Sequence, residues 1–329
     1  MSSLTGKRVL LIAPSFFGYA NEIKKEIESR GAQVDFLEDR PLRAAWKVAL
    51  SLIFPYLKQL AFARQYYQFS KRLDAQPYDF VLVINGESLT SQILLEVKDQ
   101  SPKAKYVLYM WDGMVNKPEV CNVLSSYDVA FSFDRESAEK YGLKFRPLFF
   151  VPGFEGSAQK HYRYDISFIG TMHSDRYSFI TKLQSNLPKD INAFWYLYLQ
   201  APWVYWVKRV AKLTFWSSSY SHFKFHPLNN KAVQDVFQSS RVILDIEHPS
   251  QEGLTMRTIE ALGANKKLIT TNIGISSYDF FNQQNICIVN RDKPEVPADF
   301  LKSEYVPVPK CIYDRYKLSG WVDEVLEGI

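Results

Sequence analysis

Two glutamates, Glu252 and Glu260, carry the clearest chemical signal in this chain. They stand in the stretch QEGLTMRTIEALGANKKLITTN (251–272), where a glycine loop leads into a short helix and then into an apolar strand. A carboxylate in such a loop accepts hydrogen bonds from hydroxyl groups, and a second one on the helix that follows can hold a ribose diol. Each glutamate also has a purely structural interpretation, since Glu252 can be a solvated loop acid and Glu260 can pair with Arg257 or with a lysine.

The start of the expected helix offers a place for an anion. Gly253 lets the backbone approach a ligand closely, and the N–H groups around Thr255 to Arg257 favour a negative charge at the helix end. Arg257 adds a forked donor for the same charge. This stretch therefore predicts a phosphate site.

Three acids in the first half of the chain follow apolar strands and are candidates for a general base. They are Glu87 in VINGES, Asp112 in YMWDGM and Asp134 in FSFDRE. An acid at the carboxyl end of a strand can meet a ligand at the sheet edge and take the proton from an attacking hydroxyl. Asp112 is the first choice because Trp111 beside it suits the face of a sugar, while the structural alternative for each acid is a turn or a helix N-cap. Gly18 and Asn21 are assigned to the acceptor side.

The sequence predicts alternating strands and helices, and these elements would position the candidate residues. In the first half, strands are predicted at 8–14, 32–38, 78–85, 104–112, 127–134 and 144–150, with helices at 20–31, 90–102 and 135–142. In the second half, strands are predicted at 164–171, 191–199, 241–247, 266–272 and 285–290, with helices at 174–187, 230–240, 255–263 and 318–327. Continuous apolar strands that alternate with helices are typical of doubly wound parallel α/β sheets. The polar, Pro- and Gly-containing stretch 151–163 has the composition of a linker between two domains.

The spacing of Glu252, GLTMRTI and Glu260 resembles the signature of GT-B glycosyltransferases, in particular glycosyl transferases group 1 and related bacterial capsular polysaccharide or lipopolysaccharide enzymes. The stretch YDISFIGTMHSDRY (164–177) also resembles the first strand and glycine loop of that family's donor domain. The resemblance implies two Rossmann-like domains facing a cleft. Their expected bounds are 1–155 for acceptor binding and 156–312 for the nucleotide-sugar donor, with a closing helix at 313–329 that packs back on the first domain. Thr255 and Met256 depart from the small or proline residues common in the family.

The resemblance also implies roles for individual residues. Glu252 would contact the donor sugar and Glu260 the ribose. The other donor-binding residues would surround the diphosphate, and they are Gly170, Thr171, His173, Arg176, Gly253, Leu254, Thr255 and Arg257.

The implied reaction moves a sugar of hexose type from a nucleotide-diphosphate donor to a hydroxyl of a surface polysaccharide or lipopolysaccharide. The donor, UDP- or GDP-linked, is a substrate, and no cofactor is expected. Two alternatives stay open: a nucleotide-sugar epimerase of the same fold, and a non-catalytic nucleotide- or sugar-binding partner in glycan assembly.

The composition of the chain limits which kinds of protein and which ligands are expected. The chain has 329 residues, enough for two domains, and its 47% hydrophobic and 23% charged residues are ordinary for a globular protein. A net charge of +5 suits an anionic ligand or membrane surface and falls short of the dense basic face of a nucleic-acid binder, so no nucleic acid is expected. The three cysteines are far apart and the five histidines lack metal-ligand spacing. No D-x-D triplet occurs, so a metal-held diphosphate is not indicated and the reaction is expected to be metal-independent.

Two basic aromatic segments, 41–73 and 194–216, predict contact with a membrane surface. Lys47, Pro55 and Lys58 interrupt the first segment, so it is not expected to span a bilayer. Aromatic residues with Lys or Arg at the rim are typical of an interfacial helix, although helices packed within a domain have the same composition. The first apolar run is too short for a signal peptide, and the protein is expected to be cytoplasmic and peripheral on the inner face of the cell membrane.

Overall fold

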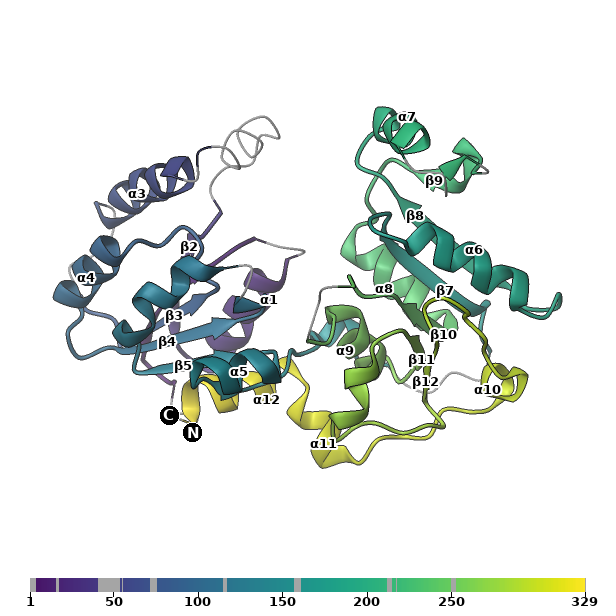
Figure 1. Ribbon diagram of the computed structural model, residues 1–329. Coiled ribbons are helices and arrows are strands. Elements are labelled where there is room, and N and C mark those ends of the chain that lie inside the picture. The colour runs from purple at the N-terminus through teal and green to yellow at the C-terminus, as the bar shows by residue number, and fades with distance from the viewer. Residues whose placement is uncertain are drawn as a thin grey trace. The chain divides into compact units, whose positions relative to one another are not determined.

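The computed structural model describes residues 4–15, 18–40, 54, 56–71, 76–114, 117–156, 161–211, 215–216, 218–249 and 253–328. The chain forms two compact units (Figure 1). Unit 1 comprises Met1–Leu148 and Leu318–Ile329, and unit 2 comprises Phe149–Lys317.

Unit 1 is built around a parallel sheet. Its strands are β1 (Arg8–Ala13), β2 (Gln33–Glu38), β3 (Phe80–Ile84), β4 (Lys105–Met110), β5 (Val129–Ser132) and β6 (Lys144–Phe145). They lie in the order β2-β1-β3-β4-β5-β6, and each neighbouring pair is parallel. The helices are α1 (Tyr19–Ser29), α3 (Tyr56–Ser70), α4 (Ser91–Gln100), the 3-10 helix η2 (Pro118–Ser126), α5 (Arg135–Tyr141) and α12 (Leu318–Val322), which continues as the π-helical turn η7 (Asp323–Glu327).

Both faces of this sheet are covered. Leu108 of β4 belongs to a buried cluster with Phe62 of α3 and Ile93 of α4. The next residue, Tyr109, points to the opposite face, because side chains alternate along a strand. There its ring packs edge-on against Trp321 of α12, with the ring centroids 4.8 Å apart. A sheet buried on both faces explains why β1 and β3 are almost continuously apolar.

Unit 2 repeats this architecture. Its strands are β7 (Tyr164–Thr171), β8 (Ala193–Tyr198), β9 (Phe223–Lys224), β10 (Ser240–Asp245), β11 (Lys267–Thr270) and β12 (Ile286–Ile288). Their order is β12-β11-β10-β7-β8-β9, again with parallel neighbours. The helices are η3 (Pro152–Phe154), α6 (Arg176–Asn186), α7 (Pro202–Ala211), η5 (Tyr220–His222), α8 (Asn230–Gln238), α9 (Met256–Gly263), η6 (Ile273–Ser277), α10 (Ala298–Lys302) and α11 (Lys310–Arg315).

The two faces of the second sheet are also covered. Phe179 and Leu183 of α6 share a buried cluster with Phe168 of β7. The helices α8 and α9 contact the strands β7, β10 and β11. At the end of α9, a Cβ atom on Gly263 would lie only 2.5 Å from the ring of Phe150, so a glycine lets the helix end approach that ring.

The predicted α/β class with two parallel sheets is confirmed, and most predicted elements are present with shorter ends. The strand expected at 144–150 is reduced to the two residues of β6, because its partner strand β5 ends at Ser132, which pairs with Phe145. In the segment 194–216, the chain completes β8 and then forms α7. In the segment 41–73, residues 41–53, 55, 72 and 73 lie outside the described residues, and Tyr56–Ser70 forms α3. No helix among the described residues combines the length and the apolar character that a membrane span requires.

Candidate functional site

The carboxyl ends of three adjacent strands of unit 2, β7, β10 and β11, form one edge of its sheet. The predicted residues Gly170 and Thr171 are the last two of β7, and the helix start at Thr255 follows β10. A Cβ atom on Gly170 would lie 2.7 Å from the ring of Phe168, so this position has room only for a glycine. This edge is where parallel α/β sheets bind ligands.

Arg176 joins two of these strand ends. Its Nε donates a hydrogen bond to the carbonyl oxygen of Ile246 at 2.8 Å, and its Nη1 donates to that of Thr171 at 3.1 Å. Arg176 is only 8% exposed. Burial, followed by the charge of Arg257, lowers the pKa of Arg176 to about 10, so it stays protonated at neutral pH. Its donors are engaged with the backbone.

A buried carboxylate fixes the start of α9. Thr255 is the N-cap, and its hydroxyl accepts a hydrogen bond from the backbone N–H of Thr258 at 3.2 Å. The hydroxyls of Thr255 and Thr258 donate to the same oxygen of Asp245, at 2.7 and 2.8 Å. The side chain of Asp245 is fully buried. Asp245 is the last residue of β10 and was not among the predicted site residues.

Arg257 is held more loosely than Arg176. Its Nη1 lies 3.9 Å from Asp245 Oδ1, which is beyond hydrogen-bond range. Within the part of the chain that the structure describes, Arg257 Nε and Asp245 Oδ1 are both buried without a hydrogen-bond partner. The guanidinium carbon lies 5.4 Å from the centroid of the Phe168 ring. Arg257 therefore has unused hydrogen-bonding capacity beside the helix start.

A second charged network lies at the same edge. Arg291 Nε donates to Asp175 at 2.7 Å, and its Nη1 donates to Glu247 at 3.0 Å. The hydroxyl of Thr271 donates to the other oxygen of Glu247 at 2.8 Å. The hydrogen bond from Arg291 lowers the pKa of Asp175, whereas burial raises the pKa of Glu247. Asp175, Glu247 and Arg291 were not among the predicted site residues. Because Arg291 follows a predicted strand and Glu247 ends one, the criterion that selected Asp112, a charged residue at the end of a strand, could have identified both.

The other predicted donor residues are mostly buried. The His173 ring lies 5.4 Å from that of His248, and burial, followed by the charge of Arg176, lowers the pKa of His173 to about 4. Gly253, Leu254 and Glu260 are buried at the start of α9 and within it. Glu252, the predicted contact to the donor sugar, lies outside the described residues.

In unit 1, Glu87 follows β3 and is surrounded by cations. Its carboxylate accepts hydrogen bonds from Lys58 and Lys117, each at 2.5 Å, and from Arg40 at 2.9 Å. Burial works to raise the pKa of Glu87, but the hydrogen bonds from Lys117 and Lys58 outweigh it and lower the pKa to about 2. A carboxylate held in this way is a weak proton acceptor at neutral pH.

Asp112 follows β4 and is more accessible, with 43% of its side chain exposed. Its Oδ2 accepts hydrogen bonds from Asn85 Nδ2 at 2.8 Å and from Arg40 Nη2 at 3.3 Å. Asn85 Oδ1 in turn accepts from the backbone N–H of Trp111 at 3.1 Å. Asn85, with a left-handed φ of 61°, thus orients the loop that carries Trp111 and Asp112.

The remaining acids and acceptor-side residues of unit 1 have structural positions. Asp134 is the N-cap of α5 and accepts hydrogen bonds from two N–H groups of its first turn, so the structural alternative for this acid is the observed one. Asp39 is buried, accepts from the N–H groups of Glu87 and Ser88, and has its pKa raised by burial to about 6. Gly18 and Asn21 lie at the start of α1, after β1.

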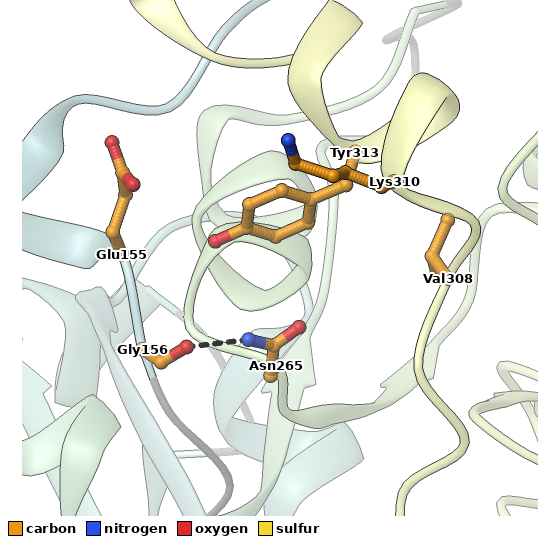
Figure 2. A pocket seen from close by; sticks show the side chains of 6 residues that line it. All are labelled: Glu155, Gly156, Asn265, Val308, Lys310 and Tyr313. Carbon is orange, nitrogen blue, oxygen red and sulfur yellow. Dashed lines mark hydrogen bonds between the residues drawn. The ribbon is translucent and has the colours of Figure 1, made fainter.

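A surface pocket of about 550 Å³ lies at the opposite end of α9 (Figure 2). Its lining residues are Glu155, Gly156, Asn265, Val308, Lys310 and Tyr313. Asn265 donates to the carbonyl oxygen of Gly156, and the Tyr313 hydroxyl donates to that of Gly263 at 2.7 Å. None of the predicted site residues lines this pocket. No group of three or more His, Cys, Asp or Glu suited to a metal ion is found among the described residues.

The sequence matches no protein-family model and no curated protein. Solved structures do match. HepE of Anabaena in complex with UDP and glucose is 9% identical, and the alignment covers 98% of this chain and 100% of that one with a TM-score of 0.62. The same protein in complex with UDP aligns at 12% identity over 98% of this chain and 100% of that one, with a TM-score of 0.59.

A glycosyltransferase from Rickettsia africae ESF-5 is 12% identical over 98% of this chain and 99% of its own, with a TM-score of 0.51. The protein has the GT-B fold. This confirms the fold that the motif from Glu252 to Glu260 predicted. At these identities the likeness concerns the GT-B fold itself, and the chemistry of the site has to be argued from its own residues.

Proposed function

We propose that the protein is a glycosyltransferase that binds the diphosphate of a nucleotide sugar at the start of α9. The observation that carries this proposal is the contrast among three arginines at one sheet edge. Arg176 and Arg291 are engaged by carbonyl and carboxylate groups, whereas Arg257 has a buried Nε without an acceptor among the described residues and a loose 3.9 Å contact with Asp245. A phosphate oxygen is the kind of acceptor that a guanidinium in this position lacks.

The remaining donor roles follow from position around this edge. The backbone of Gly253, Leu254 and Thr255 leads into α9, and their N–H groups would approach the diphosphate beside those of Met256 and Arg257, which as the first N–H groups of the helix have no acceptor within it. Glu260 of α9 binds the ribose. Arg176 acts as a positioning residue, because its hydrogen bonds hold the ends of β7 and β10 together.

The donor is proposed to be a UDP-linked sugar of hexose type. HepE, which has the same fold, was solved with UDP and with UDP-glucose, and this chemistry supports a UDP donor for the present chain. The proposed acceptor is a hydroxyl of a surface polysaccharide or lipopolysaccharide, and the proposed location is the cytoplasmic face of the membrane. GDP-sugars remain part of the test.

Asp112 is proposed as the general base. It is the exposed carboxylate at the carboxyl edge of the unit 1 sheet, whereas Glu87 is held by three cations. Asp112 would accept the proton of the acceptor hydroxyl. The hydroxyl oxygen would bond to the anomeric carbon of the donor sugar as the nucleotide diphosphate departs. Trp111, Gly18 and Asn21 would line the acceptor side, and Glu252 would contact the donor sugar.

Calorimetric titration with UDP-glucose and GDP-sugars tests the donor site. Arg257→Gln should weaken binding of the accepted nucleotide by about tenfold to a hundredfold, because a charge-assisted hydrogen bond to phosphate is lost. Arg241→Gln is the matched control, since Arg241 is a unit 2 arginine whose carboxylate partner, Glu304, is 3.5 Å away and exposed. Equal affinity of wild type and Arg257→Gln would contradict the proposed phosphate contact.

Product analysis then separates transfer from the two alternatives. Sugar transfer to an acceptor or slow release of free sugar from the bound donor is expected, and the rate should be unchanged by a metal chelator. Epimerised donor as the sole product would identify an epimerase. Tight binding with no turnover of any donor would identify a non-catalytic partner.

A further inference from the structure

The helix α7 carries a stripe of large apolar side chains that face solvent. Trp203, Trp206, Val207 and Val210 are 66%, 57%, 55% and 83% exposed. Their spacing of i, i+3, i+4 and i+7 places them on one face of the helix. A continuous exposed apolar face of this kind on a compact unit marks an interaction surface.

The opposite side of α7 fixes the helix to unit 2. Tyr205 is fully buried, and its hydroxyl donates to the carbonyl oxygen of Ser218 at 2.9 Å. Its ring lies 5.4 Å from that of Phe223 in β9, the edge strand of the sheet. Arg209 donates to the Tyr205 hydroxyl at 2.7 Å. The contacts of Tyr205 therefore fix the orientation of α7, so that its apolar stripe faces solvent. The helix lies at the β9 edge of unit 2 (Figure 1).

One more aromatic side chain extends this surface. Tyr220 follows α7 in the connection to β9 and is 42% exposed. The Tyr220 ring lies 6.3 Å from that of Trp206 in a stacked arrangement. We name Trp203, Trp206, Val207, Val210 and Tyr220 the α7 patch.

All charged residues in the sequence around the α7 patch are cations. Residues 191–234 contain no Asp or Glu, and they contain Lys208, Arg209, Lys212, Lys224 and Lys231. This charge favours an anionic partner. It also disfavours a second copy of the chain, because an isologous contact through this patch would bring the two sets of cations together without acids between them.

We propose that the α7 patch docks the protein on an anionic lipid bilayer. Trp203, Trp206 and Val210 enter the boundary between headgroups and acyl chains, where tryptophan is favoured, while the flanking cations contact anionic headgroups. The helix lies in the plane of the interface. This proposal goes beyond sugar transfer and does not depend on it, since docking requires no nucleotide.

Co-sedimentation with vesicles tests the docking in the absence of nucleotide. The protein should bind vesicles of phosphatidylcholine containing about one-third phosphatidylglycerol, bind pure phosphatidylcholine weakly, and lose binding at high salt. The double variant W203S/W206S should lower the partition coefficient by about a hundredfold, at about tenfold for each tryptophan removed from the apolar boundary. Lys208→Gln should lower it by about fivefold.

The matched control is Leu95→Ser, because Leu95 is 58% exposed on α4 of unit 1 and should leave vesicle binding unchanged. Circular dichroism verifies that each variant is folded. Quenching of wild-type tryptophan fluorescence by lipids brominated on the acyl chains reports insertion without any substitution, and quenching is expected.

Three results would overturn the proposal. The first is no binding and no quenching with anionic vesicles. The second is equal vesicle binding by wild type and W203S/W206S. The third is a wild-type dimer that W203S/W206S converts to a monomer in sedimentation velocity, which would assign the patch to a second copy. Any of these results would also overturn the membrane location in the proposed function, but it would leave nucleotide binding and sugar transfer unaffected, so the two failures can be told apart.

Discussion

Glu87→Gln should destabilise unit 1 by about 3 kcal/mol at pH 7. The carboxylate is 6% exposed and is the shared anion of Lys58, Lys117 and Arg40. Removing one member of a buried ion pair costs about 3–5 kcal/mol. The lower end of this range applies here because Lys58 and Arg40 are partly exposed. Water can therefore solvate these two cations when the carboxylate is lost.

The lowered pKa of Glu87 gives a second figure for the same contribution. Burial opposes the charged form of Glu87, but hydrogen bonds from Lys117 and Lys58 lower its pKa to about 2. Because the folded pKa lies below the unfolded value of about 4.3, the stabilisation is present above pH 4.3 and is lost as the pH falls through 2. A difference of about two pKa units corresponds to about 3 kcal/mol, which agrees with the ion-pair figure.

Urea denaturation followed by circular dichroism measures this difference for wild type and Glu87→Gln. The gap in free energy of unfolding should be constant from about pH 7 to 5 and should close as the pH is lowered toward 2. Asp112→Asn is the comparison variant. Since Asp112 is 43% exposed, its loss should cost less than about 1 kcal/mol.

The two variants should show the opposite order in catalysis. Asp112→Asn should lower kcat by about 10²- to 10⁴-fold, whereas folded Glu87→Gln should retain kcat within about tenfold. Equal stability of wild type and Glu87→Gln at pH 7 would refute the account of the cation cluster. A large loss of kcat in folded Glu87→Gln, with none in Asp112→Asn, would reverse the assignment of the base.

Three further predictions concern unit 2. Asp245→Asn should lower the free energy of unfolding by about 2 kcal/mol, because two hydroxyls lose a charged acceptor, while Asp235→Asn, at an exposed ion pair, should change it by less than about 0.5 kcal/mol in the same denaturation assay. Gly170→Ala should destabilise by about 1–3 kcal/mol, since the new methyl group would lie 2.7 Å from a phenylalanine ring, and an unchanged thermal midpoint would contradict this. The pKa of His173 is about 4 in the free protein and should rise beside a bound diphosphate. Calorimetry should therefore find that UDP-glucose binds about threefold to tenfold tighter at pH 5 than at pH 7.5. The affinity of His173→Gln should not change between these two pH values.

The long elements were predictable from sequence because periodicity is decisive over enough residues. The apolar run RVLLIA predicts β1, and the amphipathic pattern of residues 19–29 predicts α1. The helices α10 and α11 have five and six residues, too few for a periodic signal, and they were not predicted. Strand ends depend on ladder partners in other strands, which a single segment does not reveal.

The candidate site was predictable only in part. Sequence position alone brings Gly170, Thr171 and the start of α9 to one edge, because the carboxyl ends of parallel strands meet there. It does not say how charges pair. Glu87 and Asp112 looked alike in sequence, and only the three-dimensional arrangement of Lys58 and Lys117 around Glu87 distinguishes them. Asp245 was overlooked for the same reason, since its two threonine partners come from a helix that follows it in the chain.

A crystal structure of the protein soaked with UDP-glucose would show where the diphosphate binds. We expect electron density for the diphosphate at the first turn of α9, within hydrogen-bond distance of Arg257 and of the N–H groups near Thr255. Density for the diphosphate in the pocket beside Asn265, or at any position away from the carboxyl ends of β7 and β10, would contradict this expectation.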